Sequence, residues 1–224
     1  MTQQAMAYAE AQDQMYRMTY EEFLSQIDES AHAEWREGEV TVFMVPDTRH
    51  QLVSTFLVGL ISLYVNLLDL GKLFAAPFEM LLVPGRISRE PDILFVAKNH
   101  FDRLNDDRLD GPADLVIELL SDSSVTRDRD RKFYEYQGAG IPEYWVFDPR
   151  PGKQRADFYQ LSAAGKYEVI APDDAGRYHS SVLPSSWIKP EWVWQDPQPD
   201  SITVIAQMNP GLIRTLVQSL NLGQ

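Results

Sequence analysis

Apolar residues recur at helical spacing between 52 and 70. They occupy positions 53, 56, 57, 60, 61, 64, 65 and 68, which is the spacing of one buried helix face. The pattern predicts a long helix that ends at Gly71. A membrane span is the alternative, but spans need about 20 nearly continuous apolar residues, and serine, threonine, glycine, asparagine and aspartate interrupt this segment. We therefore expect a core helix and no membrane partner.

Shorter apolar runs predict strands. Three of them, at 91–96, 115–120 and 141–147, are bounded by proline, glycine or polar residues. The segment 34–44 predicts a turn or hairpin at Glu37-Gly38 that leads into a strand. Strand pairs are predicted at 72–83 and at 157–170, the latter with a turn at Ala164-Gly165.

The remaining segments predict helices and loops around these strands. Thr19 and Glu22 form a capping-box pattern before a helix at about 20–26. Other helices are expected at 125–137, which Gly138 ends, and at 210–220, while 98–110 is expected to be a charged loop that is compatible with a helix. The order predicts a mixed α/β domain with a central mixed β-sheet flanked by helices, an extra hairpin and a C-terminal tail.

The same pattern suggests how the chain is divided. We expect an N-terminal arm at 1–18, one domain at 19–190, and a C-terminal tail and helix at 191–224 that pack on the domain. No basic region followed by an apolar stretch occurs near the N-terminus. The chain also has no cysteine, which excludes disulfides and thiolate zinc sites. Both features favour a reducing, cytoplasmic location.

The formal net charge is −13. Nonspecific affinity for nucleic acid comes mostly from lysine and arginine, so this charge argues against a large phosphate-binding surface. Any nucleic-acid function would then depend on a local basic patch or on bound cations.

Two carboxylates begin or interrupt apolar strands. Glu118 stands in the middle of the run at 115–120, and Asp92 begins the run that follows Pro91. A carboxylate in an apolar strand is costly unless it is paired, protonated or bound to a metal. Mg²⁺ (or Mn²⁺) takes one or two carboxylates together with waters and phosphate oxygens. The pair therefore predicts a metal site, and Lys132, on the helix after the second strand, could orient a metal-bound water.

These motifs resemble the PD-(D/E)XK nuclease superfamily. Pro91-Asp92 matches its first half, and Glu118 matches the acid of the second half, but Leu120 stands where the lysine is expected. That departure is typical of the Uma-type family of restriction-endonuclease-like proteins. The chain is similar to it from about 20 to 190, with Asp122 where the family usually has proline. The similar segments are EWREGEV at 34–40, RHQ at 49–51, ADLVIELLS at 113–121, then Asp128, Lys132 and Tyr136, and GIPEYWVFDP at 140–149.

The resemblance implies a restriction-endonuclease-like core and a metal-dependent endonuclease that acts on nucleic acid, on DNA rather than RNA. It implies Asp92 and Glu118 as metal ligands, with the Leu119 carbonyl as a further ligand. Lys132, moved from strand to helix, would orient the attacking water or steady the phosphate. Glu34 would be an outer-sphere or second-metal ligand, and His50 would line the cleft. Homodimers are common in the superfamily, so a homodimer is also expected.

Each assignment has a structural alternative. Asp92 could cap a turn, Glu118 could pair with a core cation, and Lys132 could form only a surface pair with Asp128. Glu34 could be a solvated turn charge and His50 a residue with a structural hydrogen bond. The corresponding rival function is a non-catalytic binding or regulatory module that keeps the nuclease fold, and the acidic charge favours it.

Overall fold

Two six-stranded sheets form the centre of the computed structural model, which describes residues 14–27, 33–42, 47–120 and 128–219. Sheet A is built from β1 (Gln14–Arg17), β2 (Ala33–Arg36), β3 (Glu39–Val42), β5 (Glu79–Val83), β6 (Ile87–Arg89) and β8 (Arg108–Asp110). Sheet B is built from β4 (Gly71–Ala75), β7 (Ile93–Ala97), β9 (Leu115–Leu119), β10 (Glu143–Asp148), β11 (Arg155–Leu161) and β12 (Tyr167–Val169). A small third sheet pairs β13 (Tyr178–His179) with β14 (Trp187–Ile188).

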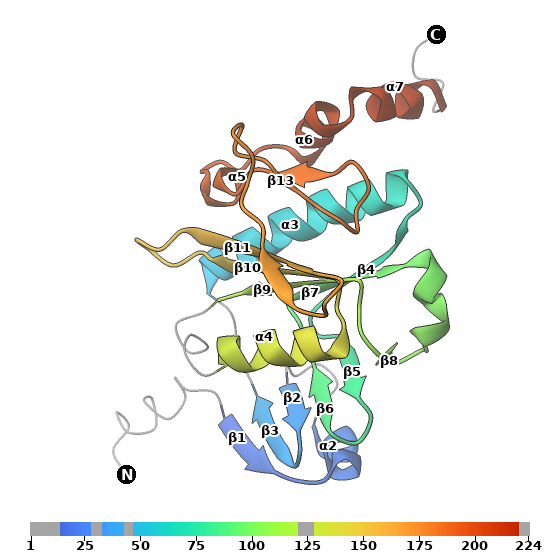
Figure 1. Ribbon diagram of the computed structural model, residues 1–224, viewed down its shortest axis with the longest axis vertical. Coiled ribbons are helices and arrows are strands. Elements are labelled where there is room, and N and C mark those ends of the chain that lie inside the picture. The colour runs from blue at the N-terminus through green and yellow to red at the C-terminus, as the bar shows by residue number, and fades with distance from the viewer. Residues whose placement is uncertain (1–13, 28–32, 43–46, 121–127, 220–224) are drawn as a thin grey trace.

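Sheet B is the predicted central mixed sheet. Its strand order is β12-β11-β10-β9-β7-β4, and β9 and β10 run parallel while the other pairs are antiparallel. Helix α3 (Thr48–Leu67) covers one face, and α4 (Asp128–Ala139) covers the other and lies between the two sheets (Figure 1). Sheet A, with the order β1-β3-β2-β6-β5-β8, was not expected as a separate sheet.

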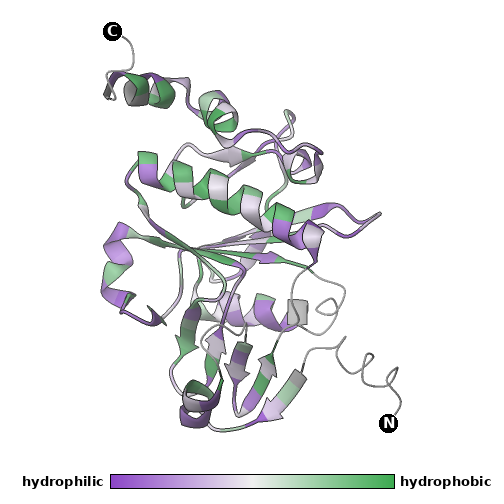
Figure 2. Ribbon diagram, turned by 180° about the vertical axis from the view of Figure 1, so that it is seen from behind, coloured by the Kyte–Doolittle hydropathy of each residue, from purple (hydrophilic) through white to green (hydrophobic). Residues whose placement is uncertain are grey.

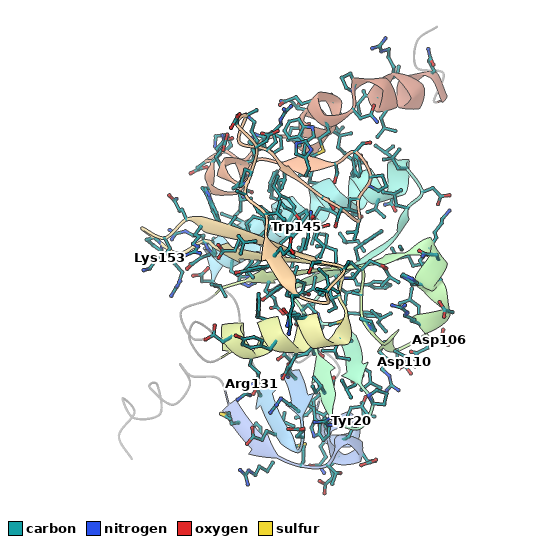
Figure 3. All side chains as sticks on the ribbon, viewed as in Figure 1. Tyr20, Asp106, Asp110, Arg131, Trp145 and Lys153 are labelled. Carbon is teal, nitrogen blue, oxygen red and sulfur yellow. The ribbon has the colours of Figure 1, made fainter. Side chains whose placement is uncertain are left out.

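Residues of sheet B alternate between two cores. One core packs against α3 and contains Phe95, Ile117 and Phe147, and the other lies on the α4 face and contains Leu94, Val116 and Tyr144. This alternation follows from the two-residue period of a strand, in which neighbouring side chains point to opposite faces. Trp145 lies in the crowded interior, whereas Lys153 lies at the outer end of the β10–β11 hairpin (Figure 3).

Helix α3 is the predicted core helix. Eight of its residues are buried, and Asp47 caps its N-terminus by accepting a hydrogen bond from the His50 N–H at 2.8 Å. Among the described residues it is the one helix long and apolar enough to cross a membrane. Figure 2 shows hydrophobic residues along α3 and along the strands beneath it. The buried residues therefore pack against the domain's own sheet.

Several local predictions are confirmed. The Thr19 hydroxyl accepts from the Glu22 N–H, and the Glu22 carboxylate accepts from the Thr19 N–H, at the start of α2 (Tyr20–Gln26). Strands β2 and β3 pair as a hairpin around Glu37 and Gly38, both with positive φ, as a tight two-residue hairpin turn requires. Strands β11 and β12 form the predicted second hairpin.

Other local predictions are wrong or incomplete. The strands at 72–83 do not pair with each other: β4 pairs with β7 in sheet B, and β5 pairs with β6 and β8 in sheet A. The expected arm contains β1, which pairs with β3. The expected helix-compatible loop at 98–110 contains the 3-10 helix η1 (Lys98–Arg103), and it also contains β8, which was not expected.

The C-terminal part is more helical than predicted. It contains α5 (Glu191–Trp194), α6 (Ser201–Met208) and α7 (Pro210–Ser219), of which only α7 was expected. Val204 and Ile205 of α6 are buried in the core on the α3 side. The described part of the chain does not include residues 125–127, where the helix α4 was predicted to begin. It also does not include Asp122 or residue 220.

Candidate active site

The five predicted site residues come together from both sheets and both flanking helices. Glu34 lies on β2, Asp92 immediately precedes β7, Glu118 lies on β9, Lys132 on α4 and His50 on α3. Their side chains are all buried, with residue exposures of 3 to 8 %. The site therefore lies where sheet A, sheet B and α4 meet.

Lys132 reaches back from α4 to the strand that precedes it. Its Nζ lies 3.1 and 3.2 Å from the two carboxylate oxygens of Glu118, and 2.8 Å from Oε1 of Glu34. The side chain is buried, which excludes a purely surface pairing. The side chain of Asp128, its proposed surface partner, lies outside the described part. One ammonium group thus serves two carboxylates.

Glu118 also accepts a hydrogen bond from the Tyr136 hydroxyl, at 2.7 Å. Burial raises the pKa of Glu118, and the neighbouring carboxylates of Asp92 and Glu34 raise it further. The Lys132 ammonium and the Tyr136 hydroxyl oppose this shift but do not cancel it. The ionised form of Glu118 is therefore disfavoured, chiefly by burial.

Asp92 joins the strand ends to α3. Its Oδ2 accepts a hydrogen bond from the Leu119 N–H at 2.7 Å, and its Oδ1 lies 3.2 Å from His50 Nε2. Burial lowers the pKa of His50, but the hydrogen bond to Asp92 and the nearby carboxylates outweigh it, so the net shift is upward. The Leu119 peptide, whose carbonyl is a predicted ligand, therefore lies directly against the Asp92 carboxylate.

Sequence reasoning missed a charged layer behind the site. Arg89, 4 % exposed at its side chain, lies 3.4 Å from Glu34 and donates to Glu135 of α4 at 2.6 Å. Glu90 accepts from the Ala33 N–H at 2.9 Å, and burial raises its pKa to about 8. The sequence does contain a sign of this layer, because Arg89 and Glu90 directly precede the Pro91-Asp92 motif.

The acids of the site suit a hard cation. No group of three histidine, cysteine, aspartate or glutamate side chains is arranged as a metal cage within the described ranges. Mg²⁺ does not need such a cage, because it keeps several waters and uses one or two carboxylates. Asp92 and Glu118 provide two carboxylates, and because burial raises the pKa of Glu118, a cation beside it would offset the cost of its ionised form. A divalent cation fits this donor set.

Comparison with known proteins shows the relationship. No curated protein matches the chain. Among solved structures, the fold is similar to a putative nuclease belonging to DUF820 from Anabaena variabilis ATCC 29413. The TM-score is 0.63 at 20% identity, over 79% of this chain and 97% of the other, so the likeness shows the fold. That fold is the predicted restriction-endonuclease-like α/β fold.

The family model described as Uma2, putative restriction endonuclease, matches residues 20–191. This range contains Glu34, His50, Asp92, Glu118 and Lys132. It also agrees with the extent of the resemblance found from the motifs alone. The chain belongs to the Uma2 family of putative restriction endonucleases.

Proposed function

We propose that this protein is a nuclease that hydrolyses phosphodiester bonds in DNA and depends on a divalent cation. One observation carries the proposal: Lys132 of α4 lies 3.1 Å from Glu118 and 2.8 Å from Glu34. Leu120 cannot take this role, because it is an apolar side chain buried in the core on the α4 face. The helix thus supplies the lysine that the strand lacks.

Asp92 and Glu118, with the Leu119 carbonyl, would hold Mg²⁺ (or Mn²⁺). When bound, the cation supplies Lewis-acid activation of water and of the phosphodiester. Lys132 orients the attacking water and steadies the phosphate charge. As the bond from water oxygen to phosphorus forms, the bond to the leaving sugar oxygen breaks; the attacking water gives up a proton to solvent, and the leaving oxygen takes up a proton from solvent. Glu34 holds Lys132 in place, and His50 holds Asp92.

The rival is a non-catalytic module that keeps the fold. Two observations favour it: both Glu118 oxygens already lie beside Lys132, and the formal net charge is −13. A salt bridge that satisfies Glu118 permanently would remove one of the two carboxylates that could hold a cation. Metal binding therefore distinguishes the two functions.

Cleavage of supercoiled plasmid with Mg²⁺ or Mn²⁺ tests the proposal. Asp92→Asn and Lys132→Met are compared with wild type and with Lys166→Met, which changes an exposed lysine between β11 and β12. We expect both site variants to lose activity by about 100-fold or more, the cost of removing a preorganised charge-stabilising group. The Lys166 variant should cleave like wild type. Equal cleavage by all four proteins, or by none, contradicts the proposal.

Calorimetric titration with Mn²⁺ separates the rival. For a nuclease, wild type releases or absorbs heat of binding and Asp92→Asn does not. If wild type gives no binding heat while remaining folded by circular dichroism, the non-catalytic module is supported.

A further inference from the structure

An aromatic cleft opens between α4 and sheet B, beside the candidate active site. Its volume is about 280 Å³. It is lined by Asp130, Phe133 and Tyr134 of α4 and by Tyr144, Val146 and Tyr159 of β10 and β11.

Strand register places this cleft next to Glu118. Val146 on β10 is the direct partner of Glu118 on β9, and Tyr144 in turn is the partner of Tyr159 on β11. Neighbouring strands lie about 4.8 Å apart, and paired residues share one face of a sheet. The floor of the cleft is therefore on the same face as the Glu118 carboxylate, one strand away.

The rim of the cleft presents an aromatic ring to solvent. Tyr134 is 67% exposed. Its ring meets that of Phe133 edge-on at 5.2 Å and 88°, and Phe133 meets Tyr159 edge-on at 5.1 Å. A supported but exposed ring offers its π-face to another planar group. Sites for drug-sized ligands have roughly 300 to 1,000 Å³, so this cleft has room for a small planar group such as one nucleobase.

Asp130 favours a base over a phosphate in this cleft. It is exposed and lies one helical turn before Tyr134, on the same side of α4. A carboxylate repels phosphate but can accept a hydrogen bond from the amino group of a base. A base in a duplex is stacked and paired, so only an unpaired base can enter such a cleft. Aromatic rings that stack unpaired bases are the usual means of binding single strands.

We infer that the cleft between α4 and β10–β11 is a subsite for an unpaired nucleobase, with Tyr134 as its stacking ring. The substrate is then single-stranded or locally melted nucleic acid, whose backbone passes from the cleft toward Glu118 and Lys132. The inference rests on the proposed nuclease function for the role of that neighbouring site, but base binding can be measured without cleavage.

Fluorescence anisotropy with a labelled oligonucleotide of about ten nucleotides, a length within the range of one single-strand site, tests the inference. The measurement uses the full chain in EDTA at low salt. Tyr134→Ala is compared with Tyr134→Phe, which keeps the ring, and with Tyr16→Ala, which removes an exposed tyrosine of sheet A. The competitors are the corresponding duplex and an abasic strand of equal length.

We expect the single strand to bind more tightly than the duplex or the abasic strand. Tyr134→Ala should weaken its binding about fivefold or more, the effect of losing one stacking ring, while the other two variants match wild type. Equal binding of the duplex or the abasic strand, or no effect of Tyr134→Ala, overturns the inference. If plasmid cleavage depends on Asp92, and Tyr134→Ala changes neither the cleavage rate nor the binding of the single strand, the subsite is overturned but the nuclease function stands. If binding of the single strand depends on the Tyr134 ring but the protein cleaves no plasmid, the subsite stands and the nuclease function is rejected.

Discussion

Lys132 is outnumbered by the acids around it. Glu34, Glu90, Asp92 and Glu118 are all buried at the junction of the sheets, and Arg89 is shared with Glu135. Burial and mutual repulsion therefore raise the pKa of Glu118 and raise that of Glu90 to about 8. At the scale of single residues, the cost of burying these acids is therefore met by a bound proton or by a neighbouring cation.

Metal-free protein should lose stability as the pH rises from about 4.5 to about 8. Glu90 keeps its proton in the folded state up to about pH 8, because burial raises its pKa from the ordinary value of 4.5. The folded state then binds more protons than the unfolded state in this window, so the free energy of unfolding falls as pH rises. One such group contributes at most about 1.4 kcal/mol per pH unit.

Glu90→Gln isolates that contribution. The amide keeps an oxygen for the Ala33 N–H, which Glu90 accepts at 2.9 Å, but it cannot ionise. Urea unfolding across the same pH range should show that the free energy of unfolding falls less steeply with pH for the variant than for wild type. Parallel curves for the two proteins would show that Glu90 titrates normally in the folded state.

At the scale of elements, Glu143 fixes β10 to the C-terminal segment. It is fully buried, and its two oxygens accept six hydrogen bonds, from Trp145, Tyr178, Ser180, Ser181 (two) and Val182, at 2.6 to 3.1 Å. Two of these donors are backbone N–H groups of residues 181 and 182. The carboxylate therefore acts as a structural acceptor for a segment that is distant in sequence.

Glu143→Ala should lower the free energy of unfolding by at least about 3 kcal/mol, because each buried donor left unpaired costs about 1–3 kcal/mol. Chemical denaturation measures the change. Glu168→Ala, at an exposed position of β12, serves as the matched control and should shift stability by about 0.5 kcal/mol or less. Similar stability of the two variants would mean that the donors find water instead.

Local patterns predicted the elements better than their partners. The capping box at Thr19, the hairpin turn at Glu37-Gly38 and the spacing of α3 all depend on residues close in sequence, and each is found as expected. Strand partners depend on distant residues, so β4 and β5 were joined although they belong to different sheets. Helix α6 was missed, although Asp200 caps it by accepting from the Thr203 N–H.

The candidate site was predictable to the extent that its chemistry is local. Asp92 and Glu118 were found because a carboxylate in an apolar strand needs an explanation. The position of Lys132 followed from the helix that returns over β9. The bond between Arg89 and Glu135 joins residues 46 positions apart, and no pattern in either segment indicates the other.

At the scale of the whole molecule, α4 connects the two sheets. Toward sheet A, Glu135 accepts hydrogen bonds from Arg36 of β2 at 2.7 Å and from Arg89 of β6 at 2.6 Å. Toward sheet B, Lys132 and Tyr136 hold Glu118 of β9. The arrangement is visible in Figure 1, where α4 lies between the sheets. The geometry of the site thus depends on a helix that sheet A helps to hold.

Glu135→Ala should loosen sheet A while sheet B stays closed. Hydrogen exchange followed by mass spectrometry would show faster exchange of β2 and β6 amides, with little change in β9 and β10, because the removed acceptor holds only the arginines of sheet A. Asp130→Asn, at an exposed position of the same helix, controls for a general effect on α4. Equal acceleration in both sheets would show that they open as one unit.

The contacts of Glu143 have a consequence for protein synthesis. Val182, one of the backbone donors that satisfy this carboxylate, is made 39 residues after it. A growing chain on the ribosome can have β9 and β10 outside the exit tunnel while Glu143 still lacks these donors. The strand beside Glu118 therefore gains its full set of donors at Glu143 only after residue 182 has left the tunnel.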